Sequence, residues 1–199
     1  MSRTVRVTLT PASPWSYMGG KRLPALHEET GARFEIRPVD AGRVFQNSGG
    51  LPLPKRHPAR QAYRLVELAR WRAHYDLPMH LEPAYFPVPD RTASLLILAG
   101  EARGLDTLTL SNALMAAVWE QERNIADRAD LTRTLEEAGF DAETLLADTE
   151  TDGPAARYDA LTEAAIAEQV FGFPWYELDG VPYWGQDRLD FVAAELRGS

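Results

Sequence analysis

The chain has 199 residues, of which 45% are hydrophobic and 25% charged, the proportions of a soluble globular protein. Its net charge of -8 and the scatter of its 21 basic residues argue against a nucleic-acid partner, and the lack of a run of about 18 apolar residues argues against a membrane span. Because the N-terminal residues alternate in polarity and no such apolar run is present, we expect a cytoplasmic protein. The absence of cysteine excludes disulfides, thiolate metal sites and a thiol nucleophile, so any sulfur chemistry must be brought by a ligand.

The N-terminal segment carries the patterns of a strand, a helix and a second strand. Residues 3–9 (RTVRVTL) place apolar side chains at every second position, which predicts a half-buried strand. Ser13 has the chemistry of an N-cap, so we expect a helix over Pro14–Glu29 that is closed by Gly31. Residues 32–39 alternate again, and a right-handed crossover would make the two strands parallel.

The middle of the chain begins with a segment rich in glycine and proline and continues with helical patterns. Residues 41–58 contain NSGG, LPLP and HP, which predict a long irregular loop. Residues 59–169 are predicted to be almost entirely helical, with helices over Ala59–Tyr75, Thr92–Gly104, Thr109–Asn124, Asp130–Ala138, Asp141–Asp148 and Gly153–Gln169. The end of the chain predicts two short strands over 174–180 and 181–184, joined by a hairpin turn, and a last helix over 185–196.

This order of elements predicts an α/β protein with a thioredoxin-like core and a large all-helical insertion between the second and third strands. The core would be discontinuous in sequence, formed by residues 1–58 and 170–199. Residues 59–169 would form the inserted helical domain.

A hydroxyl motif follows the first predicted strand. In a thioredoxin-like core a redox enzyme keeps Cys-x-x-Cys there, at a helix start that lowers a thiol pKa. This chain has Ser13-Pro14-Trp15-Ser16 instead. The Ser13 hydroxyl could donate a hydrogen bond to a thiolate that belongs to a ligand, with the helix amides adding partial positive charge. The alternative is that Ser13 only caps the helix.

A second candidate stretch is FGFPWYELDGVPYWGQDRL, residues 171–189. Pro174 falls where thioredoxin-like folds hold a cis proline beside the active helix, which would turn the backbone amide and carbonyl of Phe173 into the site. Gly185-Gln186-Asp187 opens the last predicted helix, and its amides and carboxylate would suit an amino-acid head group. Asp187 is equally well interpreted as a helix cap.

Other chemistry-bearing residues favour simpler interpretations. The histidines form no i, i+4 pair on a predicted helix face, so we expect no metal site; they are His27, His57, His74 and His80. The apolar segment 85–89, which contains Phe86, either closes over a hydrophobic substrate or packs the two domains together.

Three stretches carry a resemblance to a known family. SPWSY near the N-terminus, YRLVELARWRAHYDLP at 63–78 and VFGFPWYELDGVPYWGQDRL at 170–189 closely resemble the 2-hydroxychromene-2-carboxylate isomerase family. That family is related to kappa-class glutathione transferases and to DsbA-like proteins. The resemblance spans nearly the full length, is most specific at the two ends, and implies a glutathione-dependent enzyme that is a homodimer.

The resemblance also implies roles for individual residues. Ser13 matches the serine that holds the glutathione thiolate, and Trp15 matches the aromatic position beside it. Phe173 matches the residue before the cis proline, whose backbone pairs with the cysteinyl part of glutathione. The W-G-x-D stretch that receives the γ-glutamyl end corresponds to Trp184, Gly185, Gln186 and Asp187. In the isomerase, the thiolate adds to a ring-opened unsaturated form, a single bond rotates, and the thiolate leaves.

The chain departs from the family pattern on the substrate side. Phe45 stands where family isomerases carry a lysine that meets the substrate carboxylate, and Gly50 stands in place of an asparagine. Arg43 or Lys55 could replace the lysine if the substrate is an anion, an inference from proximity in sequence. Glutathione binding is therefore better supported by the sequence than the chromene substrate.

Three functions remain open at this stage. The first is a glutathione-dependent isomerase of an unsaturated aromatic or chromene-type acid. The second is a kappa-like glutathione transferase that conjugates an electrophile, since both reactions begin with the same thiolate attack. The third is a non-catalytic DsbA-like module that binds a peptide along Phe173-Pro174 without redox activity.

Overall fold

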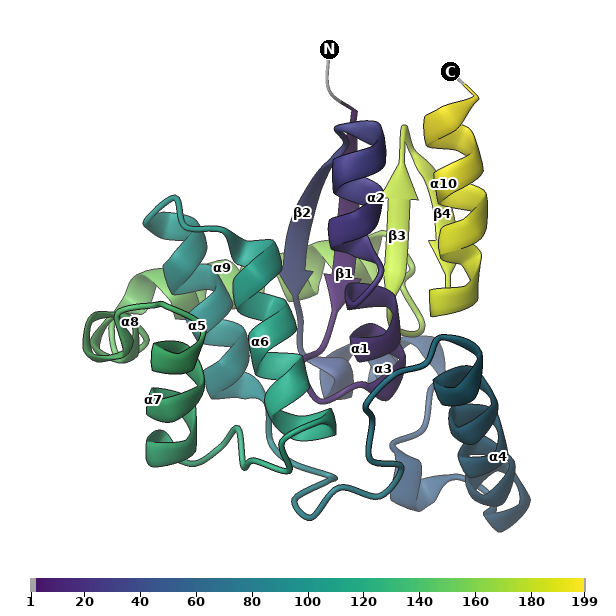
Figure 1. Cartoon of the computed structure of the whole chain (residues 1–199), viewed down its shortest axis with the longest axis horizontal. Helices are drawn as coiled ribbons and strands as arrows, with labels where there is room; N and C mark the ends of the chain where they lie inside the picture. The colour runs from purple at the N-terminus through teal and green to yellow at the C-terminus, as the bar shows by residue number, and fades with distance from the viewer. Residues whose placement is uncertain (1–2, 199) are drawn as a thin grey trace.

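A computed structural model describes residues 3–198, and the helical block of the chain lies to one side of a four-stranded sheet (Figure 1). The strands are β1 (Thr4–Leu9), β2 (Arg33–Pro38), β3 (Trp175–Leu178) and β4 (Val181–Trp184). The helices are α1 (Pro14–Gly20), α2 (Leu23–Thr30), α3 (Ala41–Ser48), α4 (Pro58–His74), α5 (Arg91–Ala102), α6 (Thr107–Trp119), α7 (Arg128–Glu137), α8 (Ala142–Asp148), α9 (Asp152–Ala167) and α10 (Leu189–Arg197), with short 3-10 turns η1 (Leu53–Lys55) and η2 (Gln186–Arg188).

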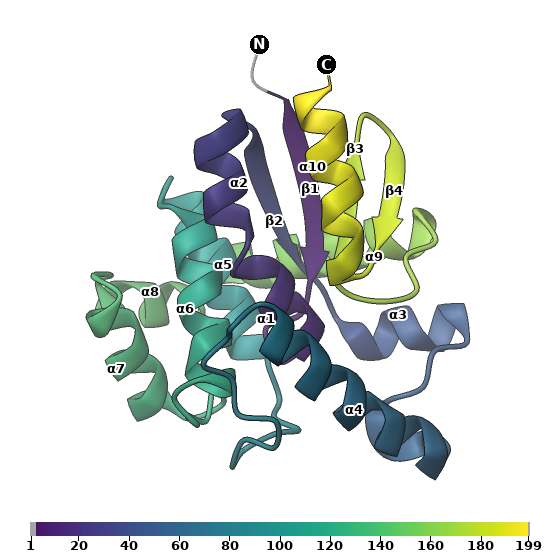
Figure 2. The same cartoon turned by 45° about the vertical axis from the view of Figure 1, so that its right-hand side comes forward.

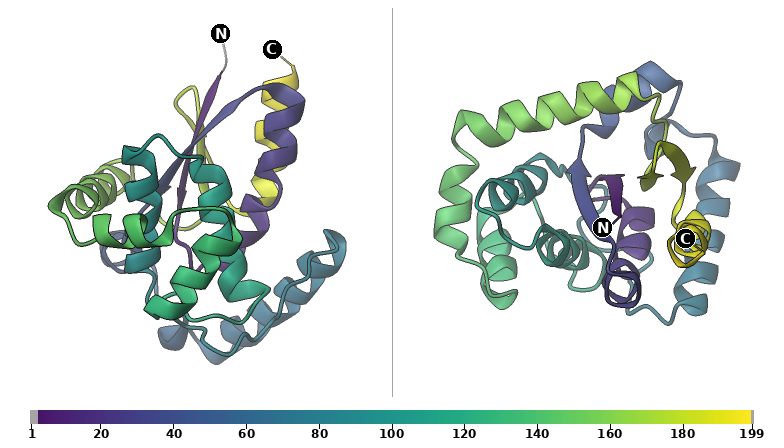
Figure 3. Two further views of the ribbon diagram at one scale, coloured as in Figure 1. Left: turned by 60° about the vertical axis from the view of Figure 1, so that its left-hand side comes forward. Right: turned by 90° about the horizontal axis from the view of Figure 1, so that it is seen from above.

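The sheet has the order β2-β1-β3-β4 and is covered on both faces. β1 pairs in parallel with β2 and antiparallel with β3, and Val5 lies opposite Phe34 on one side and Leu178 on the other. Seen from above, α9 runs along one face of the sheet, and α1, α2 and α10 cover the other (Figure 3). The thioredoxin-like core and the helical insertion between β2 and β3 are confirmed.

The predicted first helix is wrong in its middle, because the chain forms two helices there. α1 ends at Gly20 and α2 begins at Leu23. Pro24 has no N–H to donate to the carbonyl four residues earlier and its ring crowds that carbonyl, so an uninterrupted helix cannot pass through it. The predicted end is confirmed, since Gly31 adopts φ 67° and its N–H bonds to the carbonyl of His27 at 2.8 Å.

Two glycines let α1 pack tightly between the sheet and the helical block. A Cβ atom on Gly19 would collide with the hydroxyl of Tyr176 on β3. A Cβ atom on Gly20 would lie 2.5 Å from the side chain of Met115 on α6. Backbone contact on both sides fixes the position of α1, and therefore of Ser13 at its start.

The predicted loop over residues 41–58 is wrong in its first half. Asp40 accepts a hydrogen bond from the N–H of Arg43 at 3.0 Å and so caps α3, and Val44 is fully buried. α3 ends at Gly49, which has φ 74°. The glycines and polar residues of NSGG therefore end a helix instead of marking a loop throughout.

The predicted helices of the middle segment are confirmed, with shifted ends. The largest difference is at α6, which begins after its cap residue Asp106 and stops at Trp119 instead of Asn124. α4 extends away from the sheet, below α1 and beside α3 (Figure 2). The last predicted helix begins with the separate turn η2, so α10 starts at Leu189. The division into two domains stays a prediction, and within residues 3–198 no helix combines the length and apolarity needed to span a bilayer.

Candidate functional site

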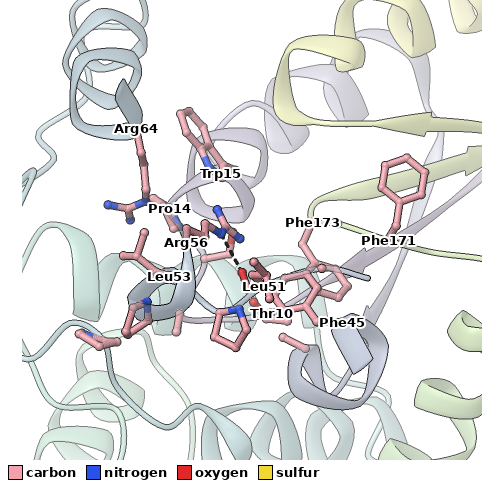
Figure 4. Close-up of a pocket in the computed structure, with 18 of the residues that line it drawn as sticks. Thr10, Pro14, Trp15, Phe45, Leu51, Leu53, Arg56, Arg64, Phe171 and Phe173 are labelled. Carbon is pink, nitrogen blue, oxygen red and sulfur yellow. Dashed lines mark hydrogen bonds between the residues drawn. The ribbon is translucent and has the colours of Figure 1, made fainter. Parts of the chain in front are cut away.

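A cavity of about 630 Å³ lies at the start of α1. Its walls come from α3, the segment 49–56, α4, the loop 86–90 and the turn before β3 (Figure 4). The volume is typical of a small-molecule site. The cavity brings together seven of the residues singled out in the sequence, which are Ser13, Trp15, Phe45, Gly50, Phe86, Phe173 and Trp184.

Ser13 is the N-cap of α1 and also lines the cavity. Its Oγ atom accepts a hydrogen bond from the N–H of Ser16 at 3.2 Å, which fixes the orientation of the side chain. Because Oγ is the acceptor in this bond, the hydroxyl hydrogen remains available, and it donates to no other described residue. Capping and donation to a ligand are therefore compatible in one serine.

Asp90 holds the turn that precedes α1. Its Oδ2 atom accepts a hydrogen bond from the N–H of Ala12 at 3.1 Å, and the residue lines the cavity. Burial raises the pKa of the Asp90 carboxyl to about 6, and the bond from Ala12 opposes part of this rise. The sequence analysis missed this residue because an aspartate just before a helix is typical of an N-cap. In the structure its side chain makes no cap bond to α5.

The proline expected beside α1 is present in the expected form. The Phe173–Pro174 peptide bond is cis, and a Cβ atom on Gly19 of α1 would lie 3.4 Å from Pro174 Cγ. The carbonyl of Pro174 accepts the N–H of Gly185 at 2.9 Å, which ties β3 to the end of β4. Phe173 lines the cavity, and its ring centroid lies 5.8 Å from that of Phe45. The pairing of Phe173 with a peptide backbone stays a prediction.

The C-terminal stretch is only partly in the cavity. Trp184 lines it, and its ring meets Phe171 edge-on at 4.7 Å between centroids. Gly185, Gln186 and Asp187 are not among the lining residues. Gln186 is buried, with 3% of its surface exposed, and Asp187 pairs with Arg188 at 2.8 Å. The proposed head-group cluster is thus beside the cavity, and its role stays a prediction.

Proximity in sequence was a poor guide on the substrate side. Arg43 points to α9, where it pairs with Asp159 at 2.9 Å and with Glu163, and it does not line the cavity. Lys55 does not line the cavity either. These ion pairs give no support to a substrate contact by Arg43, and the suggestions for Arg43 and Lys55 stay predictions.

Three arginines that the sequence analysis missed do line the cavity: Arg56, Arg60 and Arg64. Arg56 donates from Nε to the carbonyl of Leu51 at 2.7 Å. Arg64 lies over the ring of Phe86, with 5.0 Å between the guanidinium carbon and the ring centroid. The signal was visible, because Arg60 and Arg64 are four residues apart on one face of α4.

Within residues 3–198, His, Asp and Glu side chains form no group of three that could hold a metal ion. The cavity residues capable of acting on a small molecule are hydroxyls, aromatic rings, guanidinium groups and the carboxyl of Asp90.

The sheet, the cis proline beside α1 and the helical segment between β2 and β3 define a protein of thioredoxin-like fold in which a serine stands at the redox position. The family model described as DSBA-like thioredoxin domain matches residues 11–197. The chain belongs to this family.

Individual relatives show which members of this family the chain is similar to. The 2-hydroxychromene-2-carboxylate isomerase of Sphingobium xenophagum is 27% identical over 197 residues, covering 98% of this chain and 99% of that protein. The human protein named glutathione S-transferase kappa 1 is 25% identical over 97% of this chain and 90% of its own length. A solved structure of 2-hydroxychromene-2-carboxylate isomerase superposes with a TM-score of 0.86 at 25% identity, covering 98% of this chain and 94% of the other. The resemblance indicated by the sequence motifs is therefore confirmed.

Proposed function

We propose that this protein is a glutathione-dependent isomerase that resembles 2-hydroxychromene-2-carboxylate isomerase and acts on an unsaturated aromatic acid. The observation that carries the proposal is the Ser13 hydroxyl, oriented by its bond from Ser16 and positioned in the cavity wall with its hydrogen available. Similarity over nearly the whole chain to proteins named as isomerases and as a glutathione transferase supports it.

The cavity residues suit glutathione. Ser13 offers a donor to the thiolate. Pro14 has no N–H and the amide of Ser16 is bonded to Ser13, so the helix start adds partial positive charge through its dipole and not through a set of free amides. Trp15 and Phe173 offer apolar walls for the cysteinyl part. Because Asp187 lies outside the cavity wall, its pairing with the γ-glutamyl ammonium depends on the resemblance alone.

The energy required of Ser13 is modest. Lowering a thiol pKa by about two units corresponds to about 2.7 kcal/mol of preference for the thiolate. A hydrogen bond to a charged group contributes about 1.5–3 kcal/mol, and a helix terminus adds about 0.3–1 kcal/mol. One serine at the start of α1 is therefore sufficient.

In the reaction, the residues of this chain would hold the thiolate, exclude water and hold the aromatic body of the substrate. When bound, glutathione would supply a thiolate that adds reversibly to an unsaturated carbon of the substrate. Ser13 keeps the sulfur anionic by donating its hydrogen bond. Phe45 and Phe86 line the rest of the cavity, where they would exclude water and hold an aromatic body.

The test compares two serines of the same motif. Ser13→Ala should lower turnover with glutathione by about 10- to 1,000-fold, as expected for the loss of one donor to an anion. It should also remove the thiolate absorption of bound glutathione near 240 nm. Ser16→Ala is the matched control, since Ser16 Oγ is buried, has no hydrogen-bond partner among the described residues and does not line the cavity. Equal effects of the two substitutions, or no effect of either, would contradict the proposal.

A second candidate function is conjugation, which similarity to the human kappa-class protein favours. The two reactions differ in what happens to the thiol. Isomerisation returns glutathione, so the free thiol concentration stays constant while the substrate changes. Conjugation consumes one thiol per turnover, and a thiol titration during the reaction separates the two outcomes.

The resemblance also leads us to propose a homodimer in the cytoplasm, where glutathione is kept reduced. Light scattering on the purified protein tests the dimer. A monomeric mass across the micromolar range would contradict it.

A further inference from the structure

One wall of the cavity carries an unusual charge. Among its lining residues, the cations are Arg56, Arg60 and Arg64, and the acid is Asp90, whose carboxyl is already bonded to Ala12. Many of the arginines outside the cavity form ion pairs, as Arg37 does with Glu168 at 3.2 Å. The cavity thus concentrates positive charge in a chain whose net charge is -8.

Arg64 lines the cavity and is the one of these three with an unsatisfied guanidinium nitrogen. Its Nη2 atom is inaccessible to solvent and has no hydrogen-bond partner among residues 3–198. Arg56 is held by the carbonyl of Leu51, and Arg60 is exposed, where water screens its charge. A partly buried cation that has lost some hydration and has no carboxylate partner is stabilised by an anion bound beside it.

The surroundings of Arg64 hold it in place. The guanidinium lies over Phe86, whose ring packs against Trp119 at 4.9 Å between centroids, and Trp119 is fully buried. Burial lowers the pKa of Arg64 to about 10, so the group is still charged at neutral pH. In Figure 4, Arg64 lies on the opposite side of the site from Phe45 and Phe173. The cavity therefore has a cationic end and an aromatic end.

We propose that Arg64 determines the specificity of this cavity by binding the carboxylate of a second ligand, whose planar apolar body extends toward Phe45. The inference rests on the proposed function in one respect, namely that the second ligand is the substrate and glutathione occupies the Ser13 end. The ligand class is an aromatic monocarboxylate. Recognition comes from α4, an element on which the sequence analysis placed no substrate contact.

The experiment uses a pair of probes that differ only in charge. Biphenyl-4-carboxylate and biphenyl-4-carboxamide are titrated calorimetrically into the full-length protein saturated with glutathione. We expect the carboxylate to bind about 10- to 100-fold more tightly than the amide, the range expected of a charge-assisted hydrogen bond. Arg64→Met keeps most of the apolar stem and should abolish this preference, and Arg64→Lys should restore part of it.

The matched control is Arg70→Met on the same helix, because Arg70 is exposed and pairs with Glu67 outside the cavity. It should leave the preference intact. Thermal unfolding tests the state of the variants, and Arg64→Met should be at least as stable as the unmodified protein because it removes an unpaired, partly buried charge. Equal binding of the two probes, or a preference that survives Arg64→Met, would overturn the proposal.

Two further arms separate this inference from the proposed function. If glutathione displaces the carboxylate probe competitively, Arg64 holds a carboxylate of glutathione itself, and its assignment to a second ligand falls. If the preference depends on Arg64 while Ser13→Ala leaves the thiolate absorption of bound glutathione unchanged, the anion site stands and the proposed function fails. Measurements without glutathione complete the comparison, since the preference should persist there.

Discussion

The buried carboxyl of Asp90 makes a prediction that can be tested without any ligand. Replacing Asp90 by Asn keeps the size of the side chain and an oxygen that can accept the N–H of Ala12. The substitution removes only the ability to ionise. Any change in the pH dependence of stability therefore reports the cost of the buried charge.

The size of the effect follows from the shift of the pKa. Burial is the largest cause, and it raises the pKa of Asp90 from 3.8 to about 6. A difference of about 2 units corresponds to about 3 kcal/mol at about 1.36 kcal/mol per unit. Between these values the folded protein keeps a proton that the unfolded chain has lost, so the Asp90 contribution to stability declines as the pH rises from about 4 to about 6.

The assay is reversible urea unfolding of the unmodified protein and Asp90→Asn at several pH values from about 4 to 7. The variant should gain stability relative to the unmodified protein as the pH rises, reaching an advantage of about 3 kcal/mol above pH 6. Asp152→Asn, at an exposed position on α9, controls for the loss of one negative charge. A difference between the two proteins that stays constant over this range would refute the reasoning, because it would place Asp90 in a well-solvated environment.

Two further predictions concern packing and capping. Gly19→Ala should destabilise the fold by about 1–3 kcal/mol, because its Cβ would collide with the hydroxyl of Tyr176. Tyr176→Phe should relieve part of this cost, since that buried hydroxyl has no hydrogen-bond partner within residues 3–198. Equal urea midpoints for Gly19→Ala with and without Tyr176→Phe would contradict this. Asp106→Ala should cost about 0.5–2 kcal/mol, because Asp106 accepts the N–H groups of Leu108 and Thr109 at the start of α6, and Asp106→Asn should retain most of the stability in the same assay.

Local sequence patterns were sufficient for the framework of the fold. The alternation in residues 3–9 predicted β1, and the pairing with β2 is parallel as a right-handed crossover requires. Ser13 caps α1 and Gly31 ends α2, both as predicted from their chemistry. These features depend on neighbours within a few residues, which is the distance over which capping and turn preferences act.

The two wrong element predictions, the unbroken first helix and the loop in place of α3, both depend on local sequence signals. The break in the first helix required giving Pro24 more weight than the apolar pattern around it. The missed helix α3 required recognising Asp40 as a cap before a short segment that ends at Gly49. Glycine, proline and asparagine occur both in loops and at helix ends, so the structure they indicate depends on the residues that precede them.

The cavity required information that no local pattern contains. Asp90 reaches Ala12 from 78 residues away, and Arg64 meets Phe86 from another segment of the chain. Sequence reasoning named Phe45 and Phe86 as substrate-side residues but selected Arg43, which is close to Phe45 in sequence and pairs with α9 instead. The topology of the chain after α3 decides which arginine faces the cavity, and that topology follows from long-range packing.

The position of Ser13 explains how one residue can serve the fold and the site together. A thiol at the start of a helix is activated because unpaired amides favour an anion there, and that field is a property of the backbone that remains when the thiol is absent. A serine uses one of those amides, the N–H of Ser16, to orient its own oxygen. With one lone pair of the oxygen engaged by Ser16, the hydroxyl hydrogen stays free to donate to another group. Replacing cysteine by serine therefore converts a site that carries an anion into one that can hold an anion brought by another molecule.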